Sequence, residues 1–238
     1  MAFGIICLLL LVIMAWLALR RERYATAGLM IGLLVALKPQ FAVWPGLLLM
    51  AGYYRTVLAA AAAGLAAGVV PAVVYGPDIY ARWLSVTTAS TRAFGSGGNA
   101  SLVGLATRLG VPILGLALSA LLLVGLVLWS WWRRPDALRL TGISLAAMML
   151  ASPLGWIGNT IWLLPVFFAR RWTPTLWCAA LLLLLPYFSP LHVALLGLPY
   201  TAAILSVLLD SMVGERRERR VASVPNLSTD GRALPALR

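Results

Sequence analysis

Long apolar runs separated by short polar clusters make up most of this sequence. The first run, residues 2–19, can cross a hydrocarbon core of about 30 Å at about 1.5 Å per residue, and the charged segment 20–23 ends it. In hydrocarbon each backbone amide must be satisfied within its own segment, and these runs are too long and continuous for barrel strands. The pattern therefore predicts an all-α fold, a polytopic bundle of transmembrane helices.

Nine membrane crossings are predicted, some of them short or re-entrant. A Lys-Pro-Gln break at 38–40 divides one apolar run into two helices, because proline ends a helix and a mid-bilayer lysine costs about 2.5–3.5 kcal/mol. Segment 79–94, between glycine-rich turns, is predicted to form an interfacial helix. The predicted crossings are residues 2–19, 26–37, 41–54, 57–74, 111–131, 140–151, 161–168, 175–188 and 193–209.

The arginines give this topology an orientation. They gather in short clusters between apolar runs, and one assignment puts all of these clusters on the same side, as expected for cytoplasmic loops. We therefore predict a multi-pass protein of the plasma membrane with an outer N-terminus and a cytoplasmic C-terminus. Residues 1–212 form the predicted membrane domain, and residues 213–238 a basic, disordered cytoplasmic tail.

Composition supports the membrane assignment. The chain is 62% hydrophobic and 11% charged, too few polar side chains to cover a water-soluble globule. Its net charge of +12 comes from clusters that follow no single helix face and lack stacking aromatics, so membrane lipids rather than nucleic acid are the expected partners. Both cysteines lie in apolar runs, and neither a metal nor a cofactor is expected.

Several polar residues remain that cytoplasmic anchoring does not explain, and nearly all of them fall on the predicted outer side. Lys38 either binds a phosphate, for which its ammonium is a compact point charge, or extends along the apolar core so that its charge reaches the membrane surface. Arg108 suits a phosphate through its planar fork, or anchors a helix end. Asp78 is a candidate base, or caps a helix. The whole set is Lys38, Gln40, Asp78, Arg82, Arg92, Asn99, Ser101, Arg108, Ser152, Asn159 and His192.

His192 of this set and Trp156 each have two interpretations as well. His192 is either a proton carrier or a structural residue beside a proline. Trp156 is either an interface anchor or a surface on which a ligand stacks.

Three of these segments resemble the later part of glycosyltransferase family 87. They are Lys38-Pro39-Gln40, residues 99–108, and the sequence Ser-Pro-Leu-Gly-Trp-Ile-Gly-Asn at 152–159. This is a family of polyprenyl-phosphate-dependent mannosyltransferases and related enzymes with the GT-C fold. The resemblance covers about residues 28–209 and implies a GT-C-like bundle with a site on its outer face.

The expected site combines this resemblance with the residue chemistry. Lys38, Gln40 and Arg108 are expected to bind the donor phosphate, and Asp78 is the candidate catalytic base. Substrate contacts are expected from Asn99, Ser101, Ser152, Trp156 and Asn159.

The chain departs from the family pattern in two places. The family's catalytic aspartate lies in a first outer loop near the N-terminus, and no segment here is expected to hold it. The family pattern also resembles S-P-x-S-W-x-H-H, whereas Gly155 replaces the serine and Gly158-Asn159 replace the histidines. Asn159 can hydrogen-bond a sugar or phosphate, but it cannot act as an acid or base near neutral pH.

The expected function is that of a membrane hexosyltransferase, or the C-terminal portion of one. It would move a hexosyl unit, mannosyl by family resemblance, from a polyprenyl-phosphate donor to a lipid or glycan acceptor at the extracytoplasmic face. The alternative is a non-catalytic or truncated homologue that binds lipid-linked sugars or serves in assembly. A transporter is disfavoured, because the spans lack paired carboxylates or a proton-relay chain.

Overall fold

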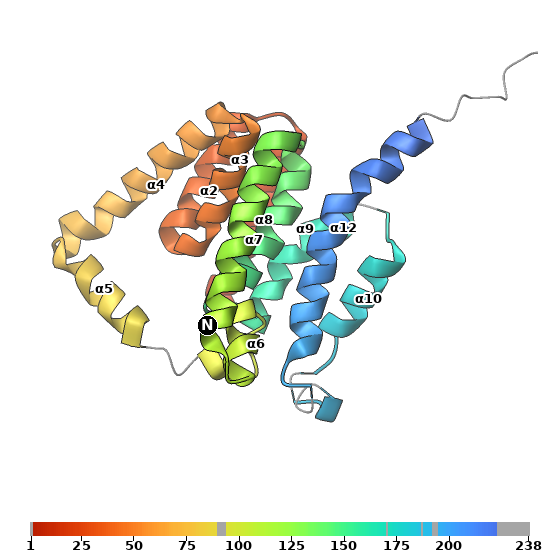
Figure 1. Ribbon diagram of the computed structural model, residues 1–238. Coiled ribbons are helices and arrows are strands. Elements are labelled where there is room, and N and C mark those ends of the chain that lie inside the picture. Colours follow the sequence, from red (N-terminus) through yellow and green to blue (C-terminus); the bar gives the residue numbers. More distant parts are fainter. Residues whose placement is uncertain (1, 90–93, 170, 187, 192–194, 223–238) are drawn as a thin grey trace, which may run out of the picture.

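The protein is built from helices packed side by side (Figure 1). The computed structural model describes residues 2–89, 94–169, 171–186, 188–191 and 195–222. Within these ranges the regular elements are α- and 3-10 helices, which confirms the predicted all-α class.

Helix α8 (Ala137–Ala151) forms the centre of the bundle. Nearly all of its side chains are buried, and it packs against α3 (Val43–Ala51), α7 (Pro112–Arg133) and α12 (Leu198–Ala222). The chain that leaves α8 therefore emerges in the middle of one end of the bundle.

A tight helix pair flanks this centre. Helix α1 (Ala2–Arg20) leads into α2 (Tyr24–Leu37), which packs along α4 (Tyr54–Tyr75). A Cβ atom added at Gly28 or Gly32 of α2 would lie 2.2 Å from a backbone oxygen of α4. These two glycines therefore allow the helix backbones to touch, a packing typical of membrane helices.

The other elements cover the outside or close one end of the bundle. Helix α4 runs away from the bundle toward α5, which lies apart on the left of Figure 1, whereas α6 packs on α7 and α10 packs on α12. These elements are η1 (Pro39–Ala42), α5 (Asp78–Ala89), α6 (Leu102–Arg108), η3 (Ile157–Leu163), α9 (Leu164–Ala169) and α10 (Pro174–Leu183).

Some helix boundaries differ from those predicted. Helix α10 ends at Leu183 rather than at 188, because Pro186 disfavours helical geometry in the residue before it. Helix α12 begins at Leu198, directly after Gly197, which has a φ of 76°. Its predicted start at 193 lies outside the described residues. The helix continues to Ala222, past the predicted domain boundary. The segment predicted as a helix over 161–168 starts as a 3-10 helix at Ile157.

Two of the described helices, Tyr54–Tyr75 and Pro112–Arg133, are long and apolar enough to cross a membrane. The other apolar helices of the described chain are shorter, 10–17 residues each. Leu58, Leu65 and Val73 of α4 expose most of their surface, as expected for a helix that faces lipid. The count of nine crossings stays a prediction.

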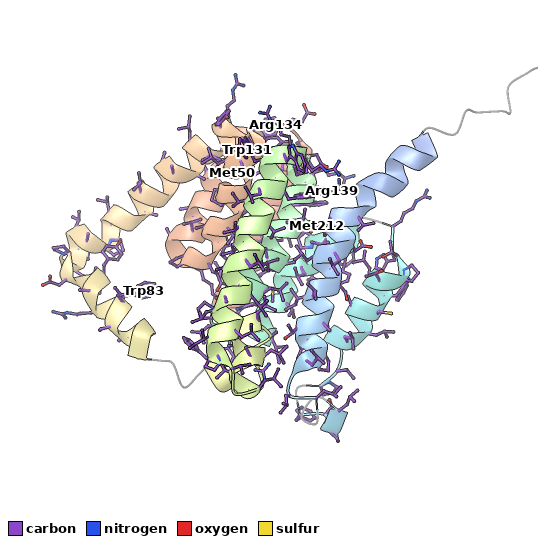
Figure 2. The ribbon with its side chains drawn as sticks, in the orientation of Figure 1. Met50, Trp83, Trp131, Arg134, Arg139 and Met212 are labelled. Atoms are coloured by element: carbon purple, nitrogen blue, oxygen red, sulfur yellow. The ribbon has the colours of Figure 1, made fainter. Side chains whose placement is uncertain are left out.

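Three arginine-bearing turns meet at one end of the bundle. The rings of Tyr24 and Tyr53 are 5.8 Å apart, and the Tyr53 hydroxyl donates to the carbonyl of Pro135. The turns α1–α2, α3–α4 and α7–α8 therefore meet at this end, where Figure 2 also shows Arg134 and Arg139. We call this the arginine-rich end; its placement in the cytoplasm stays a prediction.

Candidate functional site at the opposite end of the bundle

Two proline residues create the polar surface at the other end. Helices α2 and α8 both stop at the residue before an X-Pro pair, Lys38-Pro39 and Ser152-Pro153. Lys38 has φ −151° and ψ 97°, and Ser152 has φ −68° and ψ 136°. Both are extended because a proline clashes with a helical residue in front of it. The sequence feature that ends each helix thus also places a polar side chain at its end.

The Lys38 ammonium lies between an indole ring and an amide. Its Nζ is 4.4 Å from the centroid of the Trp162 ring and donates a hydrogen bond of 3.2 Å to Oδ1 of Asn159. Asn159 and Trp162 are three residues apart in η3, and residues at this spacing in a 3-10 helix lie above one another. One short element therefore supplies both partners of the lysine, and the cation–π contact helps to hold the charge.

Among the described residues, no carboxylate neutralises the charge on Lys38. Burial alone is the cause that lowers the pKa of Lys38, from 10.5 to about 8. A half-buried ammonium in this state has partly lost its water without gaining a counter-ion. It is therefore suited to attract an anion from outside the protein.

Two amide groups beside this lysine offer further hydrogen-bond donors. Asn159 turns its oxygen to Lys38, which can only donate. The Ser152 hydroxyl accepts from the Leu154 N–H at 3.3 Å, and donates to Oε1 of Gln40 at 3.2 Å.

The amide nitrogens, Nδ2 of Asn159 and Nε2 of Gln40, are buried and have no hydrogen-bond partner among the described residues. An ammonium and two free amide donors favour a ligand rich in acceptor oxygens, such as a phosphate. We call Lys38, Gln40, Ser152, Asn159 and Trp162 the lysine cluster.

Asn99 ties the neighbouring loop to the turn after α8. Its Nδ2 donates to the carbonyls of Phe94 and Pro153, at 3.1 and 2.7 Å. Its Oδ1 accepts from the N–H groups of Ser101 and Gly155, at 3.2 and 3.0 Å. These bonds fill the usual capacity of an amide side chain. Asn99 thus positions the loop and the turn relative to each other, and its predicted contact with a substrate stays a prediction.

Ser101 and Gly155 also shape this turn. Ser101 is fully buried, and its hydroxyl accepts from the Gly104 N–H at 2.9 Å, which caps α6. A Cβ added at Gly155 would lie 2.4 Å from the carbonyl oxygen of Met149. The serine of the family pattern therefore does not fit here, and glycine is needed for the close approach.

Arg108 lies at the same end of the bundle as Lys38. Its Nη1 donates to the carbonyl of Ser96 at 2.7 Å and its Nε to the carbonyl of Leu196 at 2.5 Å. Only Nη2 is left, buried and without a partner among the described residues. Arg108 thus joins two loops through their backbones, and its predicted contact with a donor phosphate would have to use Nη2.

Asp78 is not brought to the lysine cluster. It is exposed in the first turn of α5, where the helix dipole favours a carboxylate. Figure 1 shows α5 well apart from α6 and from the end of α8. Trp156, by contrast, is next to the cluster: it is 40% exposed and pairs with Asn99 in an antiparallel bridge. His192 and Arg92 lie outside the described residues.

Trp162 is the member of the cluster that sequence reasoning missed. It lies within a run that reads simply as apolar and aromatic, so composition gave no reason to select it. The available signal was its spacing of three from Asn159, which becomes informative only if the segment is a 3-10 helix.

The charged groups that could hold a metal are dispersed. In the ranges that the structure covers, no three side chains of His, Cys, Asp or Glu come together. In the same ranges, Lys38 and Arg108 are the cations at this end of the bundle that can bind a negatively charged ligand.

Comparison with known proteins assigns the family. The model of glycosyltransferase family 87 matches residues 5–153, more than half of the chain. This region contains Lys38, Gln40, Arg108 and Ser152, and ends just before Trp156 and Asn159. Comparisons with curated proteins and with solved structures found no match. The two membrane-length helices agree with a family of membrane glycosyltransferases, and the chain belongs to glycosyltransferase family 87.

Proposed function

We propose that this glycosyltransferase takes a hexosyl unit, mannosyl in the simplest case, from a donor in which the sugar is linked through phosphate to a polyprenol. The single observation that carries the proposal is the lysine cluster. It combines an ammonium and two buried amide NH2 groups that find neither a counter-ion nor a hydrogen-bond acceptor in the described part of the chain. A phosphodiester at the membrane surface offers the oxygens that these donors require.

The lysine cluster would act on the leaving group. The acceptor hydroxyl attacks the anomeric carbon of the donor, and the bond from that carbon to the phosphate oxygen breaks. The electron pair stays on the polyprenyl phosphate, where Lys38 and the amide of Asn159 stabilise the new charge. The acceptor proton passes to a carboxylate base, for which Asp78 is our candidate.

We place this reaction on the extracytoplasmic face of the plasma membrane. The support is the separation of charge in the fold, with the arginine-rich turns at one end and the lysine cluster at the other. The positive-inside rule assigns arginine-rich turns to the cytoplasm. In this orientation α12 also leads the C-terminus toward the cytoplasm, and the acceptor is a lipid or glycan outside the cell.

A second function deserves the same test, because Asp78 is on α5 and apart from the lysine cluster. Unless α5 moves or another chain supplies a carboxylate, the cluster has a binding group without a base. The protein would then bind a lipid-linked sugar, as a carrier or an assembly component, without transferring it.

Reconstituted protein given a radiolabelled mannosyl-phosphoryl-polyprenol and an acceptor lipid separates the two functions. An enzyme moves label to the acceptor and releases polyprenyl phosphate, whereas a carrier retains labelled donor and releases none. Lys38→Ala should abolish donor binding in either case. The matched control is Arg82→Ala, which removes an exposed cation of α5 on the same predicted side. Equal loss in both variants, or none in Lys38→Ala, would contradict the proposal.

A further inference from the structure

A second feature lies beside the lysine cluster, and the proposed binding of the phosphate does not use it. It is an open hollow of about 340 Å3 lined by Ser96, Gly98, Trp156, Ile157 and Gly158. This volume is at the lower limit of ligand pockets, which span about 300–1000 Å3, so it suits a single ring rather than an extended chain.

The walls of the hollow combine one aromatic ring with bare backbone. Trp156 exposes 40% of its surface, although it is fixed at its base by the pairing with Asn99. The glycines on the floor have no side chains, so a ligand can reach their peptide groups closely. The Ser96 hydroxyl accepts weakly from the Gly98 N–H, at 3.3 Å, and its proton can be given to a ligand oxygen.

This combination matches the chemistry of a pyranose. One face of the sugar ring carries C–H groups that pack against an aromatic ring, and its rim carries hydroxyls that bond to peptide groups and to a serine. A purely apolar ligand would not use the Ser96 hydroxyl, and a charged ligand would find no ionised side chain among the lining residues.

The hollow is also held rigidly in place. The Ile157 N–H donates to the carbonyl of Gly98 at 2.9 Å, and the Ala100 N–H donates to the carbonyl of Gly155 at 2.7 Å. The two walls, the loop before α6 and the turn after α8, are therefore joined by backbone bonds. Such a fixed shape reduces the cost of ordering the site when a ligand binds.

The hollow and the lysine cluster are separated by one turn of chain. Trp156 precedes Asn159 by three residues, and its carbonyl accepts from the Asn159 N–H at 2.9 Å. Three residues of 3-10 geometry advance about 6 Å. Asn159 in turn bonds Lys38. A sugar in the hollow would therefore have a phosphate-binding group one turn away.

We propose that this hollow is a hexopyranose-binding subsite, with Trp156 as the stacking surface and the peptide groups of Gly98 and Gly158 as its floor. The role of this subsite rests on the proposed function, because the subsite would hold a sugar next to the phosphate that Lys38 binds. The sugar comes either from the donor or from a glycan acceptor, and both present the same ring chemistry.

Binding of a free sugar tests the subsite without a lipid phosphate. The probe is methyl α-D-mannopyranoside at millimolar concentration, followed by saturation-transfer NMR on the full chain in detergent. We expect transfer to the ring C–H protons of the sugar, with at least a tenfold loss in Trp156→Ala and partial retention in Trp156→Phe. Equal signals in the wild type and in Trp156→Ala, or no signal in the wild type, would overturn the subsite.

A second variant keeps the test valid if Trp156→Ala does not fold. Gly158→Leu fills the hollow, and a Cβ at this position meets only the Cδ1 of Ile5, at an ordinary 3.5 Å. Gly125→Leu adds the same side chain on α7 where nothing lies within 4 Å, and is the matched control. We expect Gly158→Leu to lose the sugar signal and Gly125→Leu to keep it; loss in neither variant would contradict the proposal.

Comparison of ligands separates this inference from the proposed function. Lys38→Ala should keep methyl mannoside binding while losing polyprenyl phosphate, and Gly158→Leu should show the reverse. Mannoside binding without any lipid-phosphate binding would refute the proposed function and leave the subsite standing. Lipid-phosphate binding that depends on Lys38, with no mannoside binding, would refute only the subsite. If Gly158→Leu weakens binding of the glycosylated donor but not of free polyprenyl phosphate, the hollow holds the sugar of the donor. If Gly158→Leu raises only the KM for the acceptor, the hollow holds the sugar of the acceptor.

Discussion

Donor binding should fall as the pH rises through about 8, because its electrostatic part depends on one titrating group. Lys38 is the single lysine of the chain, and burial lowers the pKa of its ammonium to about 8. The lowered pKa means that the charged form is complete below this pH and is lost above it. A phosphodiester ligand stays singly charged across the same range, so the ligand adds no pH dependence of its own.

The magnitude follows from the titration of this one group. With a pKa of about 8, about nine-tenths of the protein carries the ammonium at pH 7 and about one-tenth at pH 9. If only the charged form binds, the apparent Kd for the donor rises about tenfold between these two values. An ordinary lysine, with a pKa near 10.4, would change the affinity by less than about 10% over the same interval.

Equilibrium binding of radiolabelled donor to the reconstituted protein, from pH 6.5 to 9.5, measures this profile. Lys38→Arg is the informative control, since a guanidinium stays charged throughout and should bind more weakly but with a flat profile. A flat profile in the wild type would refute the reasoning. The same slope in Lys38→Arg would refute it as well, because the titrating group would then lie elsewhere.

Three further predictions concern the shape of this end and its sidedness. Asn99→Ala should lower the free energy of unfolding by about 2–4 kcal/mol, seen as a lower Tm in detergent, because it removes the bonds joining two loops. Gly155→Ala should also lower the Tm, whereas Gly125→Ala should leave it within a degree or raise it; equal Tm values would mean that the turn can relax. In a chain whose native cysteines are replaced, Ser96→Cys should react with an impermeant thiol reagent on intact cells and Tyr54→Cys only after permeabilisation. The opposite pattern would invert the topology.

Helix ends were predictable where a proline or an arginine at the end itself signals the break. Lys38-Pro39 and Ser152-Pro153 each predict a break, and the structure ends α2 and α8 there. Arg20 and Arg133 likewise end α1 and α7 near the predicted positions. These signals act on the backbone of neighbouring residues, so they do not depend on the rest of the fold.

The partners of the polar residues were not predictable in the same way. Lys38 and Asn159 are 121 positions apart, and Ser152 and Gln40 are 112 apart. Sequence placed all four at the same end of the bundle, but it could not tell which would touch. Contacts at this separation depend on how α8 is buried among its neighbours, which the apolar pattern does not specify because nearly every position of that pattern is hydrophobic.

Arg108 and Asn99 show that the role of a polar residue could not be predicted from its type and position alone. Both were selected as polar residues that cytoplasmic anchoring does not explain, and both form hydrogen bonds with backbone groups of loops. A polar residue near a membrane can thus be retained either for a ligand or for a loop carbonyl, and only the hydrogen-bond partners distinguish the two.

The most direct test of the central claim is chemical labelling of Lys38 with and without donor. Because the chain has one lysine, an amine-reactive reagent followed by peptide mass spectrometry reports on that side chain alone once the N-terminal peptide is set aside. We expect Lys38 to be labelled readily in the free protein and to be protected by saturating mannosyl-phosphoryl-polyprenol, but not by the polyprenol without phosphate. Labelling that is unchanged by saturating donor would contradict the account.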